Sequence, residues 1–310
     1  MMGPTSPSPV ESYIAVNPAP DLGTDVYTND KKFPATRHGG RTVFGGLLVS
    51  QAISAANATV SPDFHVYSSQ SSFVRPISDK AEGRVNYHVE RTADGRTYAT
   101  RLVRAVADGV CVYIAIISFQ SAKTPAGSAL DYKIPMPELD DNPEEISQEI
   151  GKKFNSSQTN QSGGVLQAFA QEEKPFDWRP SGHILDDDPT ESCLRGFVKA
   201  RPLSTRSASV HLAGLGYASD ENLLGVAIVS NPLHVGKGGR NVAMVASLNH
   251  NISFHDPNVK VDEWMVCVRK TSWGADGRVL VHQRMWDMKS GRLVMTTEQE
   301  ALVRLKAAKL

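Results

Sequence analysis

The chain has 310 residues, with 33 lysines and arginines balanced by 33 aspartates and glutamates, and 40% apolar residues. This length can bury a sizeable core without disulfides or a structural metal, and the zero net charge gives no electrostatic reason to expect nucleic acid as a partner. Three widely spaced cysteines lack zinc-ligand spacing and favour a reducing compartment. No apolar run approaches the roughly 18 residues of a membrane span, and no signal-peptide pattern opens the chain.

The N-terminal half begins with a proline-rich stretch that has little to bury, so residues 1–10 are predicted to be a disordered tail. A helix is expected over residues 46–58, because apolar side chains recur there at helical spacing after Gly45 and Gly46. Strands are predicted at residues 84–90, 98–106 and 110–119. Residues 123–173 then become polar and rich in Asn, Ser and Gly, which indicates a long linker with one helix near residues 143–154.

The C-terminal half follows the same plan. Strands are expected at residues 176–179 and 192–200, a helix over residues 208–229, and further strands at 263–268, 279–286 and 292–303. Each half is therefore predicted to be an α+β unit in which an antiparallel sheet covers one long helix.

An internal repeat relates the two halves. SFVRP at residues 72–76 recurs as SFHDP at residues 253–257, and ADGR at residues 93–96 recurs at residues 275–278, so the copies are offset by 181 and 182 positions. Gly109 follows Gly95 at the same spacing at which Gly291 follows Gly277. Asp-Gly is a common turn dipeptide, but a turn alone does not explain the shared spacing.

These segments resemble the acyl-CoA thioesterase II family, which is built as a double hotdog. The resemblance runs in order from about residue 11 to residue 304 and is carried by RTVFGG (41–46), SFVRP (72–76), RTADGRTYATR (91–101), SFQ (118–120), GYASD (216–220), SLNH (247–250), DEW (262–264) and TEQE (297–300).

The resemblance implies an α+β fold of the tandem (double) hotdog type, with two long helices each wrapped by an antiparallel sheet. It places the N-terminal hotdog at residues 11–122, the linker at 123–173, the C-terminal hotdog at 174–305 and a targeting tail at 306–310. The implied activity is hydrolysis of acyl-CoA thioesters to free acid and CoA, with no metal and no organic cofactor.

The family assigns catalysis to an Asp, a Thr or Ser, and a Gln that hold the nucleophilic water. The resemblance puts these roles on Asn249, Thr271 and Gln299, with Asn249 at the Asp position. A carboxamide cannot accept a proton from water, so this departure suggests a specialised or weakened hydrolase. Asn249 has an alternative role as a tether of nearby backbone. His250 could substitute as base, although neighbours on a strand point to opposite faces.

Three further residues are candidates for substrate binding. Backbone N–H groups at Gly45 and Gly46 could meet an oxyanion or phosphate, although close helix–sheet packing is the favoured explanation for these glycines. Gln70 stands where many relatives carry a His, in the strand before SFVRP.

Alternative functions are a double hotdog that binds an acyl thioester with weak or no hydrolysis in a specialised metabolite pathway, a hydratase, and, least favoured, a purely structural protein. The C-terminal Ala308-Lys309-Leu310 is a close variant of the Ser-Lys-Leu peroxisomal address, which predicts a peroxisomal import receptor as partner, with a cytoplasmic location as the alternative. The resemblance also allows a homo-oligomer.

Overall fold

The structure is a computed structural model that describes residues 8–31, 33, 43–77, 84–124, 127, 130–146, 175–236 and 239–306. Its strands in the N-terminal half are β1 (Val16–Pro18), β2 (Val26–Asn29), β3 (Phe64–Phe73), β4 (Asn86–Asp94), β5 (Tyr98–Ala107) and β6 (Val110–Ser121). The C-terminal half contributes β7 (Phe176–Pro180), β8 (Cys193–Ala200), β9 (Val242–Ser247), β10 (Asn249–Phe254), β11 (Met265–Ala275), β12 (Arg278–Asp287) and β13 (Leu293–Leu305).

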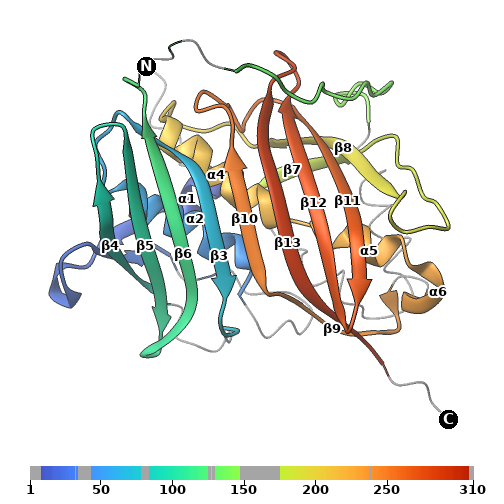
Figure 1. The fold of residues 1–310 in the computed structure, drawn as a ribbon, viewed down its shortest axis with the longest axis horizontal. Helices are drawn as coiled ribbons and strands as arrows, with labels where there is room; N and C mark the ends of the chain where they lie inside the picture. Colours follow the sequence, from blue (N-terminus) through green and yellow to red (C-terminus); the bar gives the residue numbers. More distant parts are fainter. Residues whose placement is uncertain are drawn as a thin grey trace.

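All these strands belong to one antiparallel sheet (Figure 1). The N-terminal half has the order β1-β2-β4-β5-β6-β3, and the C-terminal half has the matching order β7-β8-β11-β12-β13-β10. The halves join where β3 pairs with β10, with Gln70 opposite Asn251. Strand β9 pairs with the far end of β13, where Ser247 lies opposite Ala301. The internal repeat is therefore a repeat of topology, and the predicted α+β double hotdog is confirmed.

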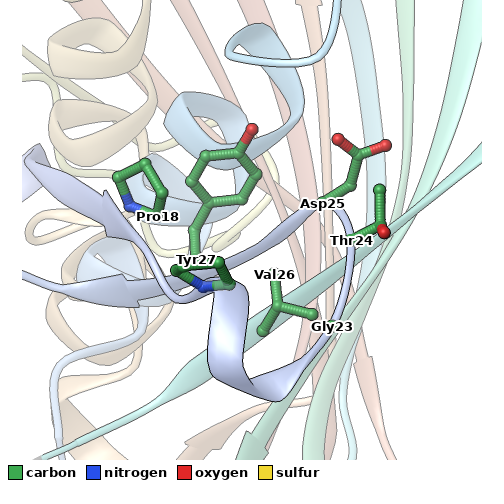
Figure 2. A pocket seen from close by; sticks show the side chains of 7 residues that line it. Pro18, Gly23, Thr24, Asp25, Val26 and Tyr27 are labelled. Carbon is green, nitrogen blue, oxygen red and sulfur yellow. The ribbon is translucent and has the colours of Figure 1, made fainter.

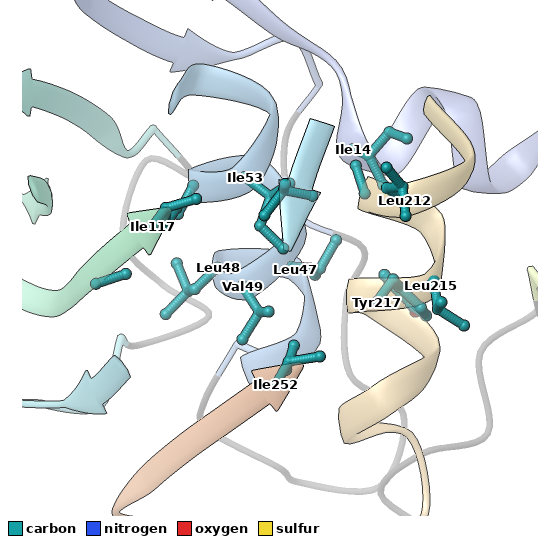
Figure 3. Close-up of a cluster of buried hydrophobic side chains, with 14 of the residues drawn as sticks. Ile14, Leu47, Leu48, Val49, Ile53, Ile117, Leu212, Leu215, Tyr217 and Ile252 are labelled. Atoms are coloured by element: carbon teal, nitrogen blue, oxygen red, sulfur yellow. The ribbon is translucent and has the colours of Figure 1, made fainter. Parts of the chain in front are cut away.

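Two helices of equal length cover the inner face of this sheet. Helix α2 (Gly45–Asn57) and helix α4 (Ala208–Asp220) pack against each other, and their apolar side chains meet in the core (Figure 3). Gly216 permits this contact, because a Cβ there would lie 2.8 Å from Cδ1 of Ile53. Smaller helices are α1 (Pro9–Ile14), α5 (Gly225–Val229), α6 (Pro232–Val235) and the 3₁₀ turn η1 (Pro20–Leu22).

Three local expectations require correction or stay open. Helix α1 starts at Pro9, inside the stretch expected to be disordered, because Glu11 accepts a hydrogen bond from the Ser8 N–H and Val10 is fully buried. The expected helix 208–229 is broken after Asp220, where Glu221 is extended and Asn222 has φ of 59°. Most of the expected linker helix lies outside the described residues, and the proposed domain boundaries stay predictions.

Candidate active site

A buried polar cluster lies where the end of α4 meets the start of α2 above the centre of the sheet. Asp220 is the last residue of α4 and is 9% exposed, and its carboxylate accepts a hydrogen bond from the Gly46 N–H. The approach needs glycine at the helix start, because a Cβ on Gly45 would lie 2.8 Å from Oδ2 of Asp220. The sequence thus brings a carboxylate against the positive end of a helix dipole.

Gln299 on strand β13 connects Asp220 to two strands. Its side chain is fully buried, its Nε2 donates to Oγ of Ser247 over 2.7 Å, and its amide also donates to the Asp220 carboxylate. Its Oε1 faces Nδ1 of His250. Ser247 ends β9 next to Gln299, so one amide holds a carboxylate, a hydroxyl and an imidazole together.

His250 on strand β10 is fully buried and bridges the sheet to helix α4. Its Nε2 lies 2.7 Å from Oγ of Ser219, and Ser219 Oγ also lies 2.7 Å from the Gly216 carbonyl oxygen. With the Gln299 amide donating to Ser247 and Asp220, its Oε1 needs a donor, so Nδ1 of His250 carries a proton. His250 thereby fixes which end of the Gln299 amide faces Asp220.

Burial controls the charge states in this cluster. Burial raises the pKa of the Asp220 carboxyl, an effect that His250, Gln299 and the Gly46 N–H partly offset. Burial lowers the pKa of His250, and Asp220 and Gln299 oppose that shift. Asp220 is therefore a stronger proton acceptor than an ordinary aspartate once it is ionised, which is the property that a general base needs.

The structure brings only one of the three sequence-predicted catalytic residues to this cluster, namely Gln299. Asn249 tethers backbone instead: its Oδ1 accepts the Glu300 N–H over 2.9 Å, and its Nδ2 lies 3.4 Å from Glu300 Oε2. Thr271 donates to the Leu280 carbonyl oxygen over 2.9 Å beside a bulge in β11, and no side-chain hydrogen bond among the described residues joins it to Gln299. The alternation along β10 sends His250 inward and leaves Asn249 outside the cluster.

Sequence reasoning missed Asp220 and Ser247, although both lie in segments that carried the family resemblance. Asp220 ends GYASD and Ser247 begins SLNH. The expectation of a helix running through to residue 229 hid the signal, because it placed Asp220 mid-helix. A helix that stops at Asp220 would have put this carboxylate at a helix end, facing the sheet.

Of the candidate substrate-binding residues, two lie at the cluster and one lies away from it. Gly45 and Gly46 border the cluster, where the Gly46 N–H is bonded to Asp220 and both glycines allow close packing. Gln70 is exposed on the outer face of β3, away from the helices.

A depression of about 280 Å³ at the sheet edge is lined by Pro18, Pro20 and Gly23–Tyr27, and it shares no residue with the Asp220 cluster (Figure 2). Within the described ranges, no three His, Cys, Asp or Glu side chains are grouped so that they could hold a metal ion. The same ranges contain no helix long and apolar enough to cross a membrane.

Comparisons with known proteins agree with this architecture. Residues 33–120 match the family model of the acyl-CoA thioesterase N-terminal domain, and residues 141–303 match that of the C-terminal domain. The chain is 31% identical to acyl-coenzyme A thioesterase 8 of Mus musculus over 275 residues, covering 85% of this chain and 81% of the relative. It is 25% identical to acyl-CoA thioesterase 2 of Haemophilus influenzae, covering 86% of this chain and 89% of the relative.

Solved structures support the fold. The crystal structure of an acyl-CoA thioesterase II from Mycobacterium marinum superposes with a TM-score of 0.73 at 23% identity, covering 96% of this chain and 99% of that one. With two family models spanning most of the sequence and a relative above 30% identity, the assignment follows: the chain belongs to the acyl-CoA thioesterase II family.

Proposed function

We propose that the chain hydrolyses acyl-CoA thioesters by direct attack of a water molecule held by Asp220, Ser247 and Gln299. The observation that carries this proposal is the contact of the Gln299 amide with both the Asp220 carboxylate and the Ser247 hydroxyl. The three groups offer a proton acceptor, a hydroxyl and an amide at one point, which is what positioning and deprotonating one water requires.

The proposed reaction has two steps. Asp220 takes a proton from the water as the water oxygen bonds to the thioester carbon, and the negative charge moves to the thioester carbonyl oxygen. The tetrahedral intermediate then collapses and the carbon–sulfur bond breaks. The CoA sulfur receives the proton that Asp220 took from the water. The start of α2 lies at the site, so the positive end of its dipole favours the anionic intermediate.

The alternative of a thioester-binding protein with weak hydrolysis depended on the absence of a carboxylate at position 249. Asp220 supplies a buried carboxylate from another element, so this reason for weak hydrolysis no longer applies. The family relatives, which are named acyl-CoA thioesterases, also favour hydrolysis.

Thiol release from acyl-CoA substrates of increasing chain length tests the proposed reaction. We expect the wild type to release CoA, and S247A to lower kcat about tenfold because water loses one of its three partners. Complete loss of activity in S247A, together with an acyl group trapped on Ser247 of the wild type, would instead make Ser247 a nucleophile. No release from any acyl-CoA by the wild type would contradict the proposed hydrolysis itself.

We also propose that the enzyme acts in the peroxisome in lipid metabolism, imported by a receptor that reads Ala308-Lys309-Leu310. These residues lie outside the described ranges, and the support is their likeness to the Ser-Lys-Leu address. A full-length chain with an N-terminal fluorescent tag should appear in peroxisomes and become diffuse when the last three residues are removed. A diffuse signal from both proteins would favour the cytoplasmic alternative, and a peroxisomal signal from both would contradict the role of the last three residues. A homo-oligomer is likewise proposed, and light scattering of the purified chain measures it.

A further inference from the structure

The backbone at the end of helix α4 is held on both sides of Asp220. The Ser219 carbonyl oxygen accepts a hydrogen bond from Nε2 of Gln283 over 3.1 Å, and the Glu221 carbonyl oxygen accepts one from Nη2 of Arg269 over 3.0 Å. Carbonyl groups at the end of a helix lack partners within the helix, so donors from other elements satisfy them. The sheet therefore holds the chain immediately before and immediately after the proposed base.

Arg269 joins these two contacts into one unit. It lies directly opposite Gln283 in the register of strands β11 and β12, and it is 8% exposed. Its Nε donates to Oε1 of Gln283 over 2.6 Å, which leaves Nε2 of the same amide to face the Ser219 carbonyl oxygen. The guanidinium thus holds Glu221 directly and Ser219 through the Gln283 amide.

Trp178 on strand β7 adds a third contact to the same guanidinium. Its ring centroid lies 4.2 Å from Cζ of Arg269, which is the distance of a cation–π contact. Its Nε1 donates to Oε2 of Glu221 over 2.8 Å, so the Glu221 side chain is tied to β7. Two carboxylates follow one another at the end of α4, and it is Asp220 that meets the Gln299 amide.

The positive charge of Arg269 does not by itself explain this arrangement. A cation near the end of a helix is favourable, and a lysine would supply one equally well. Arg269 instead uses two edges and one face of a planar group at the same time, which an ammonium group cannot do. The pKa of Asp220 responds to burial, to His250, to Gln299 and to the Gly46 N–H. Arg269 contacts the backbone beside Asp220, so its effect is on where the carboxylate lies.

We propose that Arg269 is a positioning residue for the hydrolysis, which fixes the end of α4 so that Asp220 stays within reach of the water at Ser247 and Gln299. This inference rests on the proposed function, since it takes Asp220 as the base. Displacing a reacting group by about 1 Å can lower the rate by about 10²-fold, so a support of this kind has a measurable effect on kcat.

The kinetic test uses R269K and R269M. Lysine keeps the charge but loses the fork, so we expect kcat to fall about tenfold in R269K and about 10–100-fold in R269M. The acid side of the kcat profile should stay at the wild-type pH in both variants. Wild-type kcat in R269K would show that the charge alone is sufficient and would overturn the proposal. A shifted acid side would show that Arg269 acts on the Asp220 pKa, and would also overturn it.

Two controls keep this test decisive. R101M is the matched variant, because Arg101 is a buried arginine that holds a helix end in the other half, and it should keep the wild-type kcat. R269K retains the charge and much of the side-chain length, so it decides the question if R269M does not fold. A fall in kcat of R101M equal to that of R269K would show a general effect of losing a buried arginine and would overturn the proposal.

A binding measurement distinguishes placement of the base from distortion of the whole site. The CoA thioether that carries a butyl group cannot be hydrolysed, so its Kd reports binding without turnover. We expect its Kd in R269K to stay within about twofold of the wild-type value, because Arg269 acts on the base and not on the substrate. A Kd raised by the same factor by which kcat falls would overturn the proposal.

A double-mutant cycle with D220N separates failure of this inference from failure of the proposed hydrolysis. At high enzyme concentration, R269K should lower the residual kcat of D220N by less than about threefold, because the base is no longer there to be positioned. The same tenfold loss in both backgrounds would overturn the role of Arg269 and leave the proposed hydrolysis standing. Full activity in D220N alone would contradict the proposed hydrolysis instead.

Discussion

The two halves of the sheet have one topology and different inner surfaces. Helices α2 and α4 each have 13 residues and end at Asn57 and Asp220. Ser69 precedes His250 by 181 positions, and Ile117 precedes Gln299 by 182, which are the offsets of the internal repeat. The N-terminal copy thus lacks the carboxylate, the imidazole and the amide at corresponding places. The two halves therefore share one scaffold, and a few inward side chains determine which half holds the polar cluster.

Arg101 and Gln283 show how each half uses one corresponding position. Arg101 is 1% exposed and donates to Thr59, Ala93 and Asp94, which fastens the end of α2 to the β4–β5 hairpin. Gln283, 182 positions later, donates to the Ser219 carbonyl oxygen and accepts from Arg269. The first residue holds a helix end in place for stability, and the second holds the helix end that carries Asp220.

Among the variants that contrast corresponding positions of the two halves, the largest effect is expected at Gln299, whose counterpart in the other half is Ile117. Q299A should reduce kcat by roughly 10²–10³-fold, because Asp220 and Ser247 lose the amide that connects them. Thiol release under saturating acyl-CoA measures it. A Q299A enzyme within threefold of the wild type would break the assignment of the site to the C-terminal half.

The pH dependence of kcat is the next effect in size. Because burial raises the Asp220 pKa above 3.8, the carboxylate is lost as the pH falls through that raised value, and kcat should drop about tenfold for each further pH unit. For the same reason protonation favours the folded state, so Asp220 does not make the fold acid-labile. A flat acid side of the profile in a folded enzyme would contradict the role of Asp220.

Substitutions at Arg101 and at Gln283 should affect stability and activity differently. R101M should lower the free energy of unfolding by about 1–3 kcal/mol, because the buried Thr59 oxygens lose their donor, and should leave kcat of the folded enzyme unchanged. Q283L should lower both quantities, because it frees the end of α4. Urea unfolding and thiol release on the same samples measure the two effects. Equal loss of kcat in both variants would mean that the halves are not functionally distinct.

The smallest effect concerns the nitrogen through which His250 acts. H250N can keep a donor near the Nδ1 position and should retain kcat within about threefold, whereas H250Q extends past that position and should lose about tenfold. The pH profile should keep its shape in both, since His250 is a positioning residue. S219A, which removes only the contact at Nε2, should resemble the wild type. A larger loss in H250N than in H250Q would show that Nε2 carries the function.

Much of the fold could be predicted because its signals are periodic. Helix α2, the strands on either side of both ADGR turns and the repeat itself follow from apolar spacing and turn residues. Strand β3 is rich in serine and was expected only through the family resemblance, whereas β9, which is short and half exposed, was not predicted.

The site was harder to predict because it depends on where one helix ends. The Asn249 side chain resembles the expected aspartate in shape and stands next to His250, which joins the cluster, yet strand alternation turns Asn249 away. Asp220 reaches the cluster only because α4 stops there, and the left-handed Asn222 that follows gave no unambiguous signal in the sequence.

Thiol release by D220N and N249A, measured side by side with the wild type, tests the central claim most directly. The account predicts a loss of roughly 10²–10⁴-fold in D220N, which removes the proposed base, with Tm retained because a buried charge is replaced by a neutral group of the same shape. It predicts near wild-type turnover in N249A, since Asn249 only ties β10 to β13. Full activity in D220N together with loss of activity in N249A would contradict it.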